Sequence, residues 1–570
     1  MEAMQDTLTL PGIEVAYDVG VAMADGVELA TDIYLPAHGR PAPALLLRTP
    51  YGKHDVFNQG YAHPTWYASR GFAVVCQDVR GRGDSGGEFY PYAAEAEDGA
   101  RTVAWTARQP WCTGKVGMYG FSYGGATQML AATTTPPALA AHAPGMTGSN
   151  YCEGWTYQDG AHNLAIILSW AAALGVDQAN RAGHAAAAAS LSELLAHPGD
   201  LYARLPVRDA IPERLRKPYL PYLDHWLDHP TYDDYWKQWS PREHYPAIRI
   251  PGMHIAGWYD VFLEPTIENY ANLGRQGEAP QMLVVGPWYH MPWSQYVGAV
   301  DFGEAGRNVI DELQVRFFGR WLKDERNGID EEPPVRLFVM GANRWILEDR
   351  WPPRNARAQT FHLTSDGRAN SLNGTGRLGR EPGPGNAPPD ACPINPFVPL
   401  MSLGGRSCCY AHGAPMGPED QRSQEIRNDM LVYDSEPLDR ELTVIGTPKV
   451  VLSYASNAST TDVVARLVDV HPDGRAINVS DAITRLPASD VASRGVVRLD
   501  IRMSPTAVCL GPGHRIRLEI GGSSFPTHDR NPNTGASSIE AAAGEFRVAT
   551  LFVFHDERHV STLDLPLVDG

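Results

Sequence analysis

Gly120-Phe121-Ser122-Tyr123-Gly124 is the most informative pentapeptide of this chain. It follows a short run of mainly apolar residues at 115–119 and precedes a run of small and apolar residues at 125–132 that is typical of a helix. A serine at the tip of a strand-to-helix turn needs small residues two positions before and two positions after it, because the backbones of the strand and the helix approach closely there. The amides that begin the helix would face the serine and could bind an oxyanion. The pattern predicts a nucleophilic serine, although an ordinary glycine-rich turn would contain the same residues.

Apolar runs before and after this motif predict a parallel sheet. Residues 44–48 and 72–76 are mostly apolar without alternation, as is typical of strands buried on both faces of such a sheet. Residues 93–105 indicate a helix with acidic residues in its first turns. Two further apolar runs lie at 248–257 and 281–286. This alternation of strands and helices predicts an α/β fold.

Residues 146–240 differ in character from the segments on either side of them. An alanine-rich run at 184–195 is typical of helices, and many aromatic residues follow it. We expect an all-helical insertion within the α/β sheet, with most of these aromatic side chains packed between the helices and the sheet. The aromatic residues are Tyr219, Tyr222, Trp226, Tyr232, Tyr235, Trp236 and Trp239.

The pattern changes again near residue 355. A loop rich in glycine, proline and asparagine at 365–396 precedes many short β-branched runs, and residues 470–475 contain a strong hairpin signal. These features predict a β-sandwich of about 200 residues. The predicted domains are an α/β core at 1–145 and 241–354, a helical insertion at 146–240 and a β domain at 355–570.

Charge and hydropathy exclude several classes of protein. With 66 acidic and 48 basic side chains, the 570 residues carry a formal net charge of -18, which disfavours binding to nucleic acid. No apolar run is long enough to span a bilayer, so we expect no membrane partner. Residues 1–6 lack the basic-then-apolar start of a secretory signal, and we therefore expect a cytoplasmic location.

The seven cysteines do not form a recognisable metal motif. There is no Cys-x-x-Cys pair and no His-Glu-x-x-His sequence, so we expect no metal site. We interpret most of the cysteines as small buried residues. The adjacent pair Cys408-Cys409 has no explanation in the sequence.

Asp260 and His290 follow Ser122 in the order that an α/β-hydrolase sheet requires. A serine hydroxyl is a poor nucleophile unless a base lies within hydrogen-bonding reach and an acid orients that base. Asp260 comes just after one of the two later strands, and His290 comes just after the other. His254 is a competing histidine, but it lies inside an expected strand, where core packing is the better interpretation.

An oxyanion hole needs two hydrogen-bond donors. The amide of Tyr123 is one candidate, because Tyr123 directly follows the nucleophile. The other should come from the loop after an early strand, a position that residues 48–53 occupy. Tyr51 in this loop offers a hydroxyl and an amide, although an ordinary turn with a packed tyrosine would look the same.

An ordered set of short motifs makes the chain resemble the CocE/NonD hydrolases, the family that includes bacterial cocaine esterase, and more distantly the X-prolyl dipeptidyl peptidases. The motifs lie at 48–52, 77–87, 120–124, 257–260, 286–290 and 529–535. The resemblance implies an α/β-hydrolase core, an inserted helical cap and a C-terminal jelly roll. It also implies Ser122 as nucleophile, His290 as base and Asp260 as the acid that orients the base. Tyr51 would donate its hydroxyl to the oxyanion beside the Tyr123 amide.

The same resemblance implies a pocket for the acyl group. Trp155, Trp170 and Phe262 stand where the family places aromatic pocket residues. No metal or organic cofactor is implied, and a homodimer is a candidate assembly. The glycine-rich loop at 80–87 is similar to an anion-binding motif, but we interpret it as a structural turn because no phosphate-binding lysine follows.

We therefore expect a serine hydrolase that cleaves small-molecule esters, or amides, of a neutral or aromatic acyl group through an acyl-enzyme. An ammonium-bearing substrate would need carboxylates beside the pocket, and the nearest acids in sequence are Glu153 and Glu264. A β-lactam side-chain acylase, an α-amino-acid ester hydrolase or an X-prolyl dipeptidyl aminopeptidase is the alternative. A binding protein on an inactive hydrolase scaffold is a further alternative, which the complete triad disfavours.

Overall fold

The structure is a computed structural model. The residues that it describes are 7–10, 12–55, 60–291, 293–410, 412–486 and 495–568. Residues 1–6, on which the expectation about location depends, lie outside the described residues. No helix in the described part of the chain is long and apolar enough to cross a membrane.

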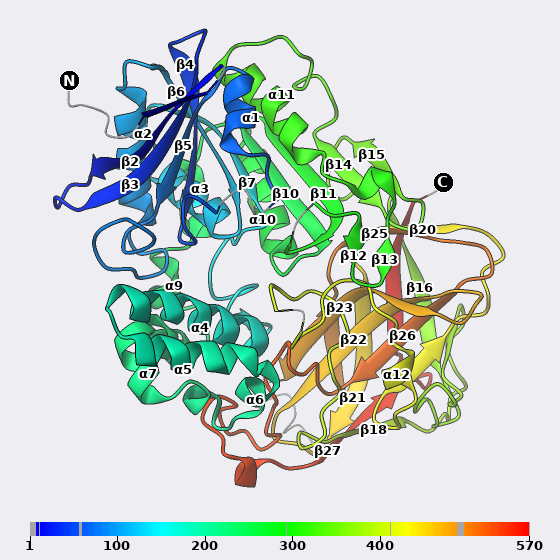
Figure 1. Cartoon of the computed structure of the whole chain (residues 1–570). Coiled ribbons are helices and arrows are strands. Elements are labelled where there is room, and N and C mark those ends of the chain that lie inside the picture. The colour runs from blue at the N-terminus through cyan, green and yellow to red at the C-terminus, as the bar shows by residue number, and fades with distance from the viewer. Residues whose placement is uncertain are drawn as a thin grey trace.

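One mixed sheet forms the centre of the α/β part (Figure 1). Among the described residues it has eleven strands in the order β1-β2-β3-β5-β4-β6-β7-β10-β11-β14-β15. Within this order, the strands from β5 to β14 run parallel to one another, as the apolar runs predict. The strands are β1 (Thr7–Leu10), β2 (Ile13–Ala22), β3 (Glu28–Pro36), β4 (Ala42–Thr49), β5 (Ala73–Asp78), β6 (Cys112–Phe121), β7 (Leu139–Gly145), β10 (Gly252–Tyr259), β11 (Gln281–Tyr289), β14 (Val335–Val339) and β15 (Arg344–Glu348).

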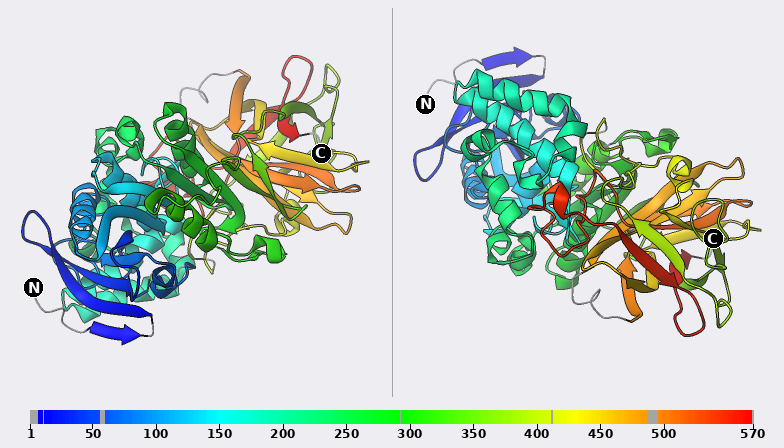
Figure 2. Two further views of the ribbon diagram at one scale, coloured as in Figure 1. Left: turned by 90° about the horizontal axis from the view of Figure 1, so that it is seen from above. Right: turned by 90° about the horizontal axis from the view of Figure 1, so that it is seen from below.

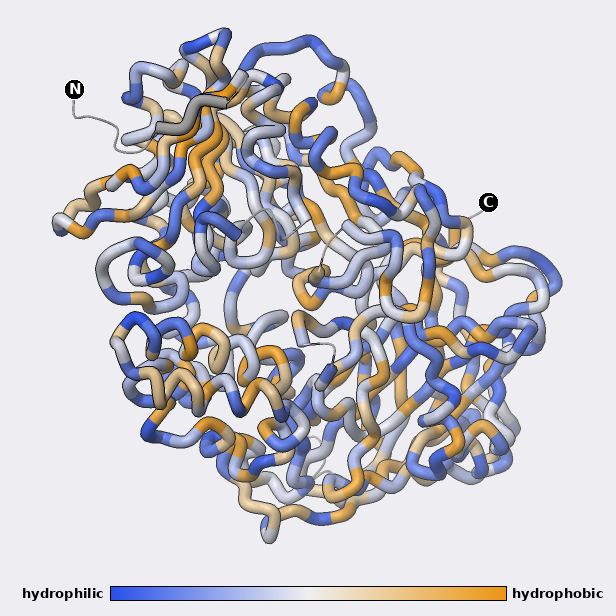
Figure 3. Tube along the Cα trace, viewed as in Figure 1, coloured by the Kyte–Doolittle hydropathy of each residue, from blue (hydrophilic) through white to orange (hydrophobic). Residues whose placement is uncertain are grey.

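Helices cover both faces of this sheet. Leu45 of β4 belongs to the same apolar cluster as Phe318, whereas Leu46 belongs to a second cluster with Val103 and Met129. Successive side chains of a strand point to opposite faces, so α11 covers one face and α2 and α3 cover the other. Figure 3 shows hydrophobic residues along these central strands. The elements around the sheet are α1 (Pro64–Ser69), α2 (Glu95–Ala107), α3 (Tyr123–Thr133), η3 (Pro241–Ala247), α10 (Leu263–Gln276), β12 (Tyr296–Val297), β13 (Val300–Asp301), η4 (Glu304–Gly306) and α11 (Ile310–Leu322).

The insertion between β7 and β10 is mainly helical, but it is not all-helical as expected. A two-stranded sheet, β8 with β9, precedes its first helix. Strands of two residues are too short to leave an alternating pattern, which is why the sequence did not reveal them. The elements are β8 (Tyr157–Gln158), β9 (Ala161–His162), α4 (Leu164–Arg181), α5 (Ala185–Ala196), α6 (Pro198–Ala203), η2 (Val207–Asp209), α7 (Glu213–Tyr219), α8 (Pro221–Asp228) and α9 (Asp234–Lys237).

The aromatic residues of the insertion hold it together and attach it to the core. Tyr222, Trp226 and Trp236 are buried, and they share one apolar cluster with Tyr123 of α3. The insertion also contacts the β domain, because the Arg208 amide donates to the Ile539 carbonyl at 3.2 Å. The right view of Figure 2 shows the insertion beside the β domain.

The C-terminal part is an all-β domain of thirteen strands within the described residues. The strands β22 and β23 form the expected hairpin, closed by a hydrogen bond from the His471 amide to the Arg475 carbonyl at 2.8 Å. The expectation of a continuous loop at 365–396 is wrong, because two strands, β17 and β18, lie inside it. The elements are β16 (Arg357–Thr364), β17 (Arg377–Gly379), β18 (Asp390–Ile394), α12 (Arg422–Glu425), β19 (Leu431–Asp434), β20 (Leu442–Gly446), β21 (Lys449–Ser456), β22 (Thr461–Val470), β23 (Ala476–Leu486), β24 (Val497–Arg502), β25 (Thr506–Leu510), β26 (Arg515–Gly521), η5 (Ala543–Glu545), β27 (Ala549–Phe554) and β28 (Thr562–Val568).

Most cysteines are buried, as expected. The free and buried cysteines are Cys76, Cys112, Cys152, Cys392 and Cys509. Cys408 and Cys409 form a disulfide between adjacent residues.

Candidate active site

Ser122 occupies a sharp turn between β6 and α3. Its backbone has φ 59° and ψ -124°, a conformation that a non-glycine residue adopts only under strain. A Cβ added to Gly120 would lie 3.3 Å from the backbone of Gly124, so the close approach predicted from the motif is present. The Ser122 amide donates to the Gly145 carbonyl on the neighbouring strand β7 at 2.9 Å, which fixes the turn against the sheet.

Asp260 and His290 meet Ser122 at the carboxyl ends of adjacent parallel strands. Asp260 directly follows β10 and His290 directly follows β11. The His290 Nε2 atom lies 2.8 Å from the Ser122 Oγ atom, and His290 Nδ1 lies 2.7 Å from Asp260 Oδ1. Asp260 accepts a hydrogen bond from Nδ1–H, which holds the imidazole in the tautomer whose Nε2 lone pair is free to accept the serine proton. His290 is 3% exposed and Asp260 is fully buried. His254, the other histidine considered as the base, is buried inside β10, where its Nε2 atom lies 2.9 Å from the Gln281 Oε1 atom.

Two candidate donors for an oxyanion, Tyr51 and Tyr123, line the same pocket as Ser122. The hydroxyl of Tyr51 accepts a hydrogen bond from Trp170 Nε1 at 3.0 Å and lies beside Ser122. Burial raises the pKa of Tyr51, more than its hydrogen bonds with Trp170 and Ser122 lower it, so the hydroxyl keeps its proton. Tyr123 is the first residue of α3, and the first amides of a helix have no partner within it. Its N–H is therefore available to an oxyanion.

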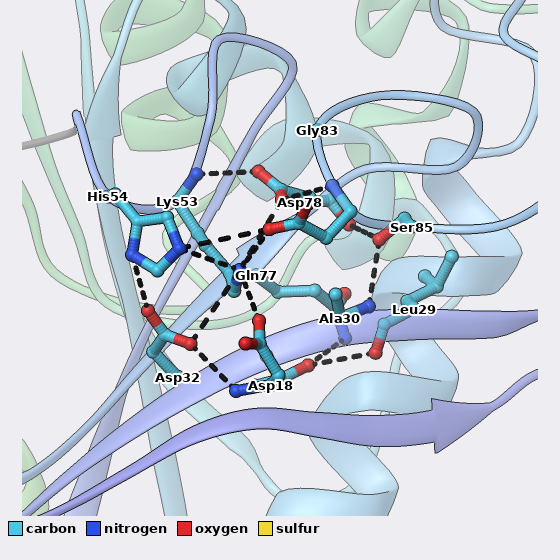
Figure 4. Close-up of polar contacts among 12 residues, drawn as sticks. Asp18, Leu29, Ala30, Asp32, Lys53, His54, Gln77, Asp78, Gly83 and Ser85 are labelled. Carbon is cyan, nitrogen blue, oxygen red and sulfur yellow. Dashed lines mark hydrogen bonds and ion pairs between the residues drawn. The ribbon is translucent and has the colours of Figure 1, made fainter. Parts of the chain in front are cut away.

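The Tyr51 loop is anchored by a buried lysine that the sequence reading did not single out. Lys53 is 1% exposed, and its ammonium lies 2.6 Å from Asp84 and 2.7 Å from Asp18. Burial alone would lower the pKa of Lys53, but the hydrogen bonds with Asp18 and Asp84 raise it, so the ammonium stays charged. The Lys53 amide also donates to Asp78 Oδ1 at 2.6 Å. Figure 4 shows Lys53 together with the carboxylates of Asp18, Asp32 and Asp78.

The same carboxylates explain the glycine-rich loop at 80–87. Asp78 Oδ2 accepts the Asp84 amide at 2.9 Å, and a Cβ at Gly83 would come within 2.1 Å of that oxygen (Figure 4). Gly83 also has φ +49°, in the left-handed region. The loop therefore wraps around a carboxylate of its own chain, in agreement with its interpretation as a structural turn.

The three aromatic residues expected to bind the acyl group line one pocket with Ser122. The rings of Trp155 and Phe262 stack with centroids 5.3 Å apart, and Trp155 meets Trp170 edge-on at 5.4 Å. The space between its walls, part of which is open to solvent, amounts to about 240 Å³. Its lining residues are Tyr51, Tyr92, Ser122, Tyr123, Ala126, Thr147, Tyr151, Trp155, Trp170 and Phe262. Among these described residues none has a carboxylate, a lysine or an arginine.

The acids nearest to the triad in sequence do not line this pocket. Glu264, at the start of α10, forms an ion pair with Arg406, which also binds Asp481 at 3.0 Å. Burial raises the pKa of Glu264 by more than the nearby charge of Arg406 lowers it. Burial raises the pKa of Glu153 to about 6, and its Oε2 accepts the amide of Asp159 at 3.3 Å.

Arg406 belongs to the β domain, and the residues after it reach the triad. Ser407 forms an isolated parallel β-bridge with Asp260. Cys408 lies in the same apolar cluster as Trp155 and Phe262. The sequence carried no signal for this contact, because Ser407 lies 147 positions after Asp260 in the chain. The unusual cysteine pair was the one feature of this segment that stood out in the sequence. Residues of the β domain thus form part of the surroundings of the active site.

Two family models match the chain. The model for X-Pro dipeptidyl-peptidase (S15 family) matches residues 25–292, which contain all three triad residues. The model for the X-Pro dipeptidyl-peptidase C-terminal non-catalytic domain matches residues 327–564.

Individual proteins are similar over nearly the whole chain. Cocaine esterase of Rhodococcus sp. (strain MB1 Bresler) is 34% identical over 97% of this chain and 98% of its own length. A solved α-amino acid ester hydrolase superposes with a TM-score of 0.79 at 23% identity, covering 98% of this chain and 97% of that one. An aminopeptidase from the marine sediment archaeon Thaumarchaeota archaeon superposes with a TM-score of 0.80 at 23% identity, with the same coverage. The last two share the fold. The chain therefore belongs to the CocE/NonD family of serine hydrolases, which carries the S15 domain together with the X-Pro dipeptidyl-peptidase C-terminal domain.

Proposed function

We propose that this enzyme hydrolyses carboxylic esters of small neutral or aromatic acyl groups in two acyl-transfer steps. The observation that carries this proposal is the uncharged aromatic pocket that opens onto Ser122. Similarity to cocaine esterase supports an ester as the substrate. Amides with the same acyl groups are slower candidate substrates, because an amine is a poorer leaving group than an alcohol.

In the first step, His290 Nε2 accepts the Ser122 proton while the serine oxygen attacks the ester carbonyl. The Tyr51 hydroxyl and the Tyr123 amide stabilise the oxyanion of the tetrahedral intermediate. His290 then donates its proton to the leaving alcohol as the carbon–oxygen bond breaks, and an acyl-enzyme remains. In the second step, His290 takes a proton from water, which attacks the acyl-enzyme and releases the acid. Asp260 stabilises the imidazolium that forms in each step.

The alternative substrates carry an ammonium group near the acyl carbon, as in α-amino-acid esters and X-prolyl peptides. Binding a buried ammonium requires a carboxylate partner. Glu264 is already paired with Arg406, and no lining residue of the pocket among those described is acidic. The charge of the site therefore favours a neutral acyl group over an α-amino acyl group or the amino side chain of a β-lactam.

A fluorophosphonate probe and three substrates test the proposal. We expect the probe to label Ser122, and Ser122→Ala to lose both labelling and esterase activity. We expect p-nitrophenyl acetate and benzoate to be cleaved faster than an Ala-Pro anilide. Preferential turnover of the anilide would overturn the substrate assignment. Unchanged activity of Ser122→Ala would overturn the mechanism, and absence of labelling would favour a binding protein on an inactive scaffold. The cytoplasmic location stays a prediction from the sequence, and the homodimer stays a prediction from the family resemblance.

A further inference from the structure

The Cys408-Cys409 pair lies beside the proposed catalytic base. The two sulfur atoms and one ring nitrogen of His290 all lie within 4.8 Å of one another. Cys409 is exposed, whereas Cys408 and His290 are buried, so the pair connects the solvent with the base. Two cysteines and one histidine are the ligand set of open zinc sites, in which water occupies the fourth position.

Several contacts hold this segment against the triad. Ser407 bridges to Asp260, and the preceding Arg406 pairs with both Glu264 and Asp481. At the base of the segment, the Gly405 amide donates to the Gly417 carbonyl at 2.7 Å, and the reverse hydrogen bond measures 3.0 Å. These contacts involve residues 405–407 and not the sulfur atoms, so they hold the backbone that leads into the cysteine pair beside the triad in both redox states.

We propose that Cys408, Cys409 and His290 form an inhibitory site for a soft divalent cation such as Zn²⁺, which exists only when the disulfide is reduced. A dithiol reductant supplies two electrons and two protons to the disulfide, giving two thiols and the cyclic disulfide of the reductant. Zn²⁺ then displaces the two thiol protons, because only thiolates bind the metal. In a tetrahedral zinc site the two sulfurs lie about 3.8 Å apart and each lies about 3.6 Å from the nitrogen. Reduction of the disulfide frees the two sulfur atoms to separate to this distance, and both already lie within 4.8 Å of the His290 nitrogen.

The inhibition follows from the nitrogen that the metal occupies. His290 Nδ1 donates to Asp260, so Nε2 is the nitrogen that can bind zinc. A carboxylate that accepts from the other ring nitrogen is the usual support of a zinc-bound histidine. Zinc on Nε2 removes the acceptor for the Ser122 proton, and the triad loses its base. A small-molecule disulfide can take two electrons from the two thiolates and become two thiols, which re-forms the Cys408–Cys409 disulfide. That disulfide has no thiolates, so the metal is released and activity is restored.

This inference depends on the proposed role of His290, and its test has one measurement that needs no turnover. Metal-free enzyme is prepared in two forms. In one the cysteine pair is a disulfide, and in the other a dithiol has reduced the pair and has then been removed. Zn²⁺ binding to each form is measured by titration calorimetry. We expect the reduced enzyme to bind one more equivalent of Zn²⁺ than the oxidised enzyme. Cys408→Ser/Cys409→Ser should lose this equivalent, whereas Cys112→Ser should keep it. Cys112 begins β6 and Ser122 follows its other end, about 30 Å away for a strand of this length.

Fluorophosphonate labelling and ester hydrolysis are then followed with and without Zn²⁺. We expect Zn²⁺ to slow both by about 10⁴-fold in the reduced enzyme, because blocking the base costs at least as much as leaving it in the wrong tautomer, and to leave the oxidised enzyme unaffected. Equal zinc binding by both redox forms, or by the double variant, would overturn the proposal. So would zinc binding without loss of labelling. If the double variant does not fold, the two redox forms of the unmodified enzyme still decide the question. Failure to label Ser122 without metal would instead refute the proposed function.

Discussion

Tyr51→Phe tests whether the Tyr51 hydroxyl stabilises the oxyanion. The substitution keeps the aromatic ring in the pocket wall and removes one of two donors, leaving the Tyr123 amide. Loss of one such donor typically lowers kcat by about 10²–10³-fold, or about 2.7–4 kcal/mol of transition-state stabilisation. We expect KM to change little, because the oxyanion forms only in the transition state. The variant also leaves Trp170 Nε1 without its acceptor, which costs about 1–3 kcal/mol of folding free energy.

The assay is the pre-steady-state hydrolysis of p-nitrophenyl acetate, which separates acylation from deacylation. Tyr245→Phe is the matched control, because this buried hydroxyl donates to Asn269 Oδ1 at 2.8 Å and lies outside the pocket. The control should lose about 1 kcal/mol of stability and keep its acylation rate. If Tyr51→Phe acylates as fast as the control, the hydroxyl is not an oxyanion donor. If its KM rises while kcat is kept, the hydroxyl binds the ground state.

Three further predictions follow from the geometry of the described residues. Asp260→Asn should lower kcat by about 10⁴-fold through the wrong histidine tautomer, with KM nearly kept, as steady-state kinetics would show; a loss below about tenfold would contradict the orienting role. Lys53→Met leaves the buried carboxylates of Asp32 and Asp78 without the ammonium that lies 3.8 and 3.9 Å away, and should lower the free energy of unfolding by about 3 kcal/mol in urea titrations, whereas an unchanged midpoint would mean that the network contributes nothing. Burial lowers the pKa of His162, His254 and His528 to about 4, so these groups are neutral in the folded chain and protonate in the unfolded chain below about pH 6.5. The free energy of unfolding should therefore fall as the pH drops from about 6.5 to 4, by about 1.4 kcal/mol per pH unit for each histidine. His254→Gln should reduce this slope by about 1.4 kcal/mol per pH unit, the contribution of one proton.

The triad could be predicted from the sequence because its geometry is local to each strand. Ser122, Asp260 and His290 each follow a parallel strand directly, and the carboxyl ends of such strands meet at one edge of the sheet. Knowing the strands was therefore enough to bring the three side chains together. The aromatic pocket residues Trp155 and Trp170 came instead from family resemblance, since nothing in the spacing of the insertion points them toward the serine.

The features that the sequence did not reveal depend on contacts between distant segments. The pairing of Glu264 with Arg406 joins α10 to the β domain, and no local pattern indicates which acid finds which base. Tyr92 and Tyr151 line the pocket, but both lie in connecting segments, whose residues show no helical or strand periodicity that would predict this position. The two-residue strands β8 and β9, and the strands inside 365–396, are stabilised by their neighbours more than by their own residues.

The bridge between Ser407 and Asp260 has a consequence for how this enzyme loses activity on heating. The β domain supplies a contact to the acid of the triad, so unfolding of that domain alone would be enough to disturb the site. The half-life of activity would then report the unfolding rate of the C-terminal domain. Efforts to make the enzyme more durable should begin with the seam between the two domains.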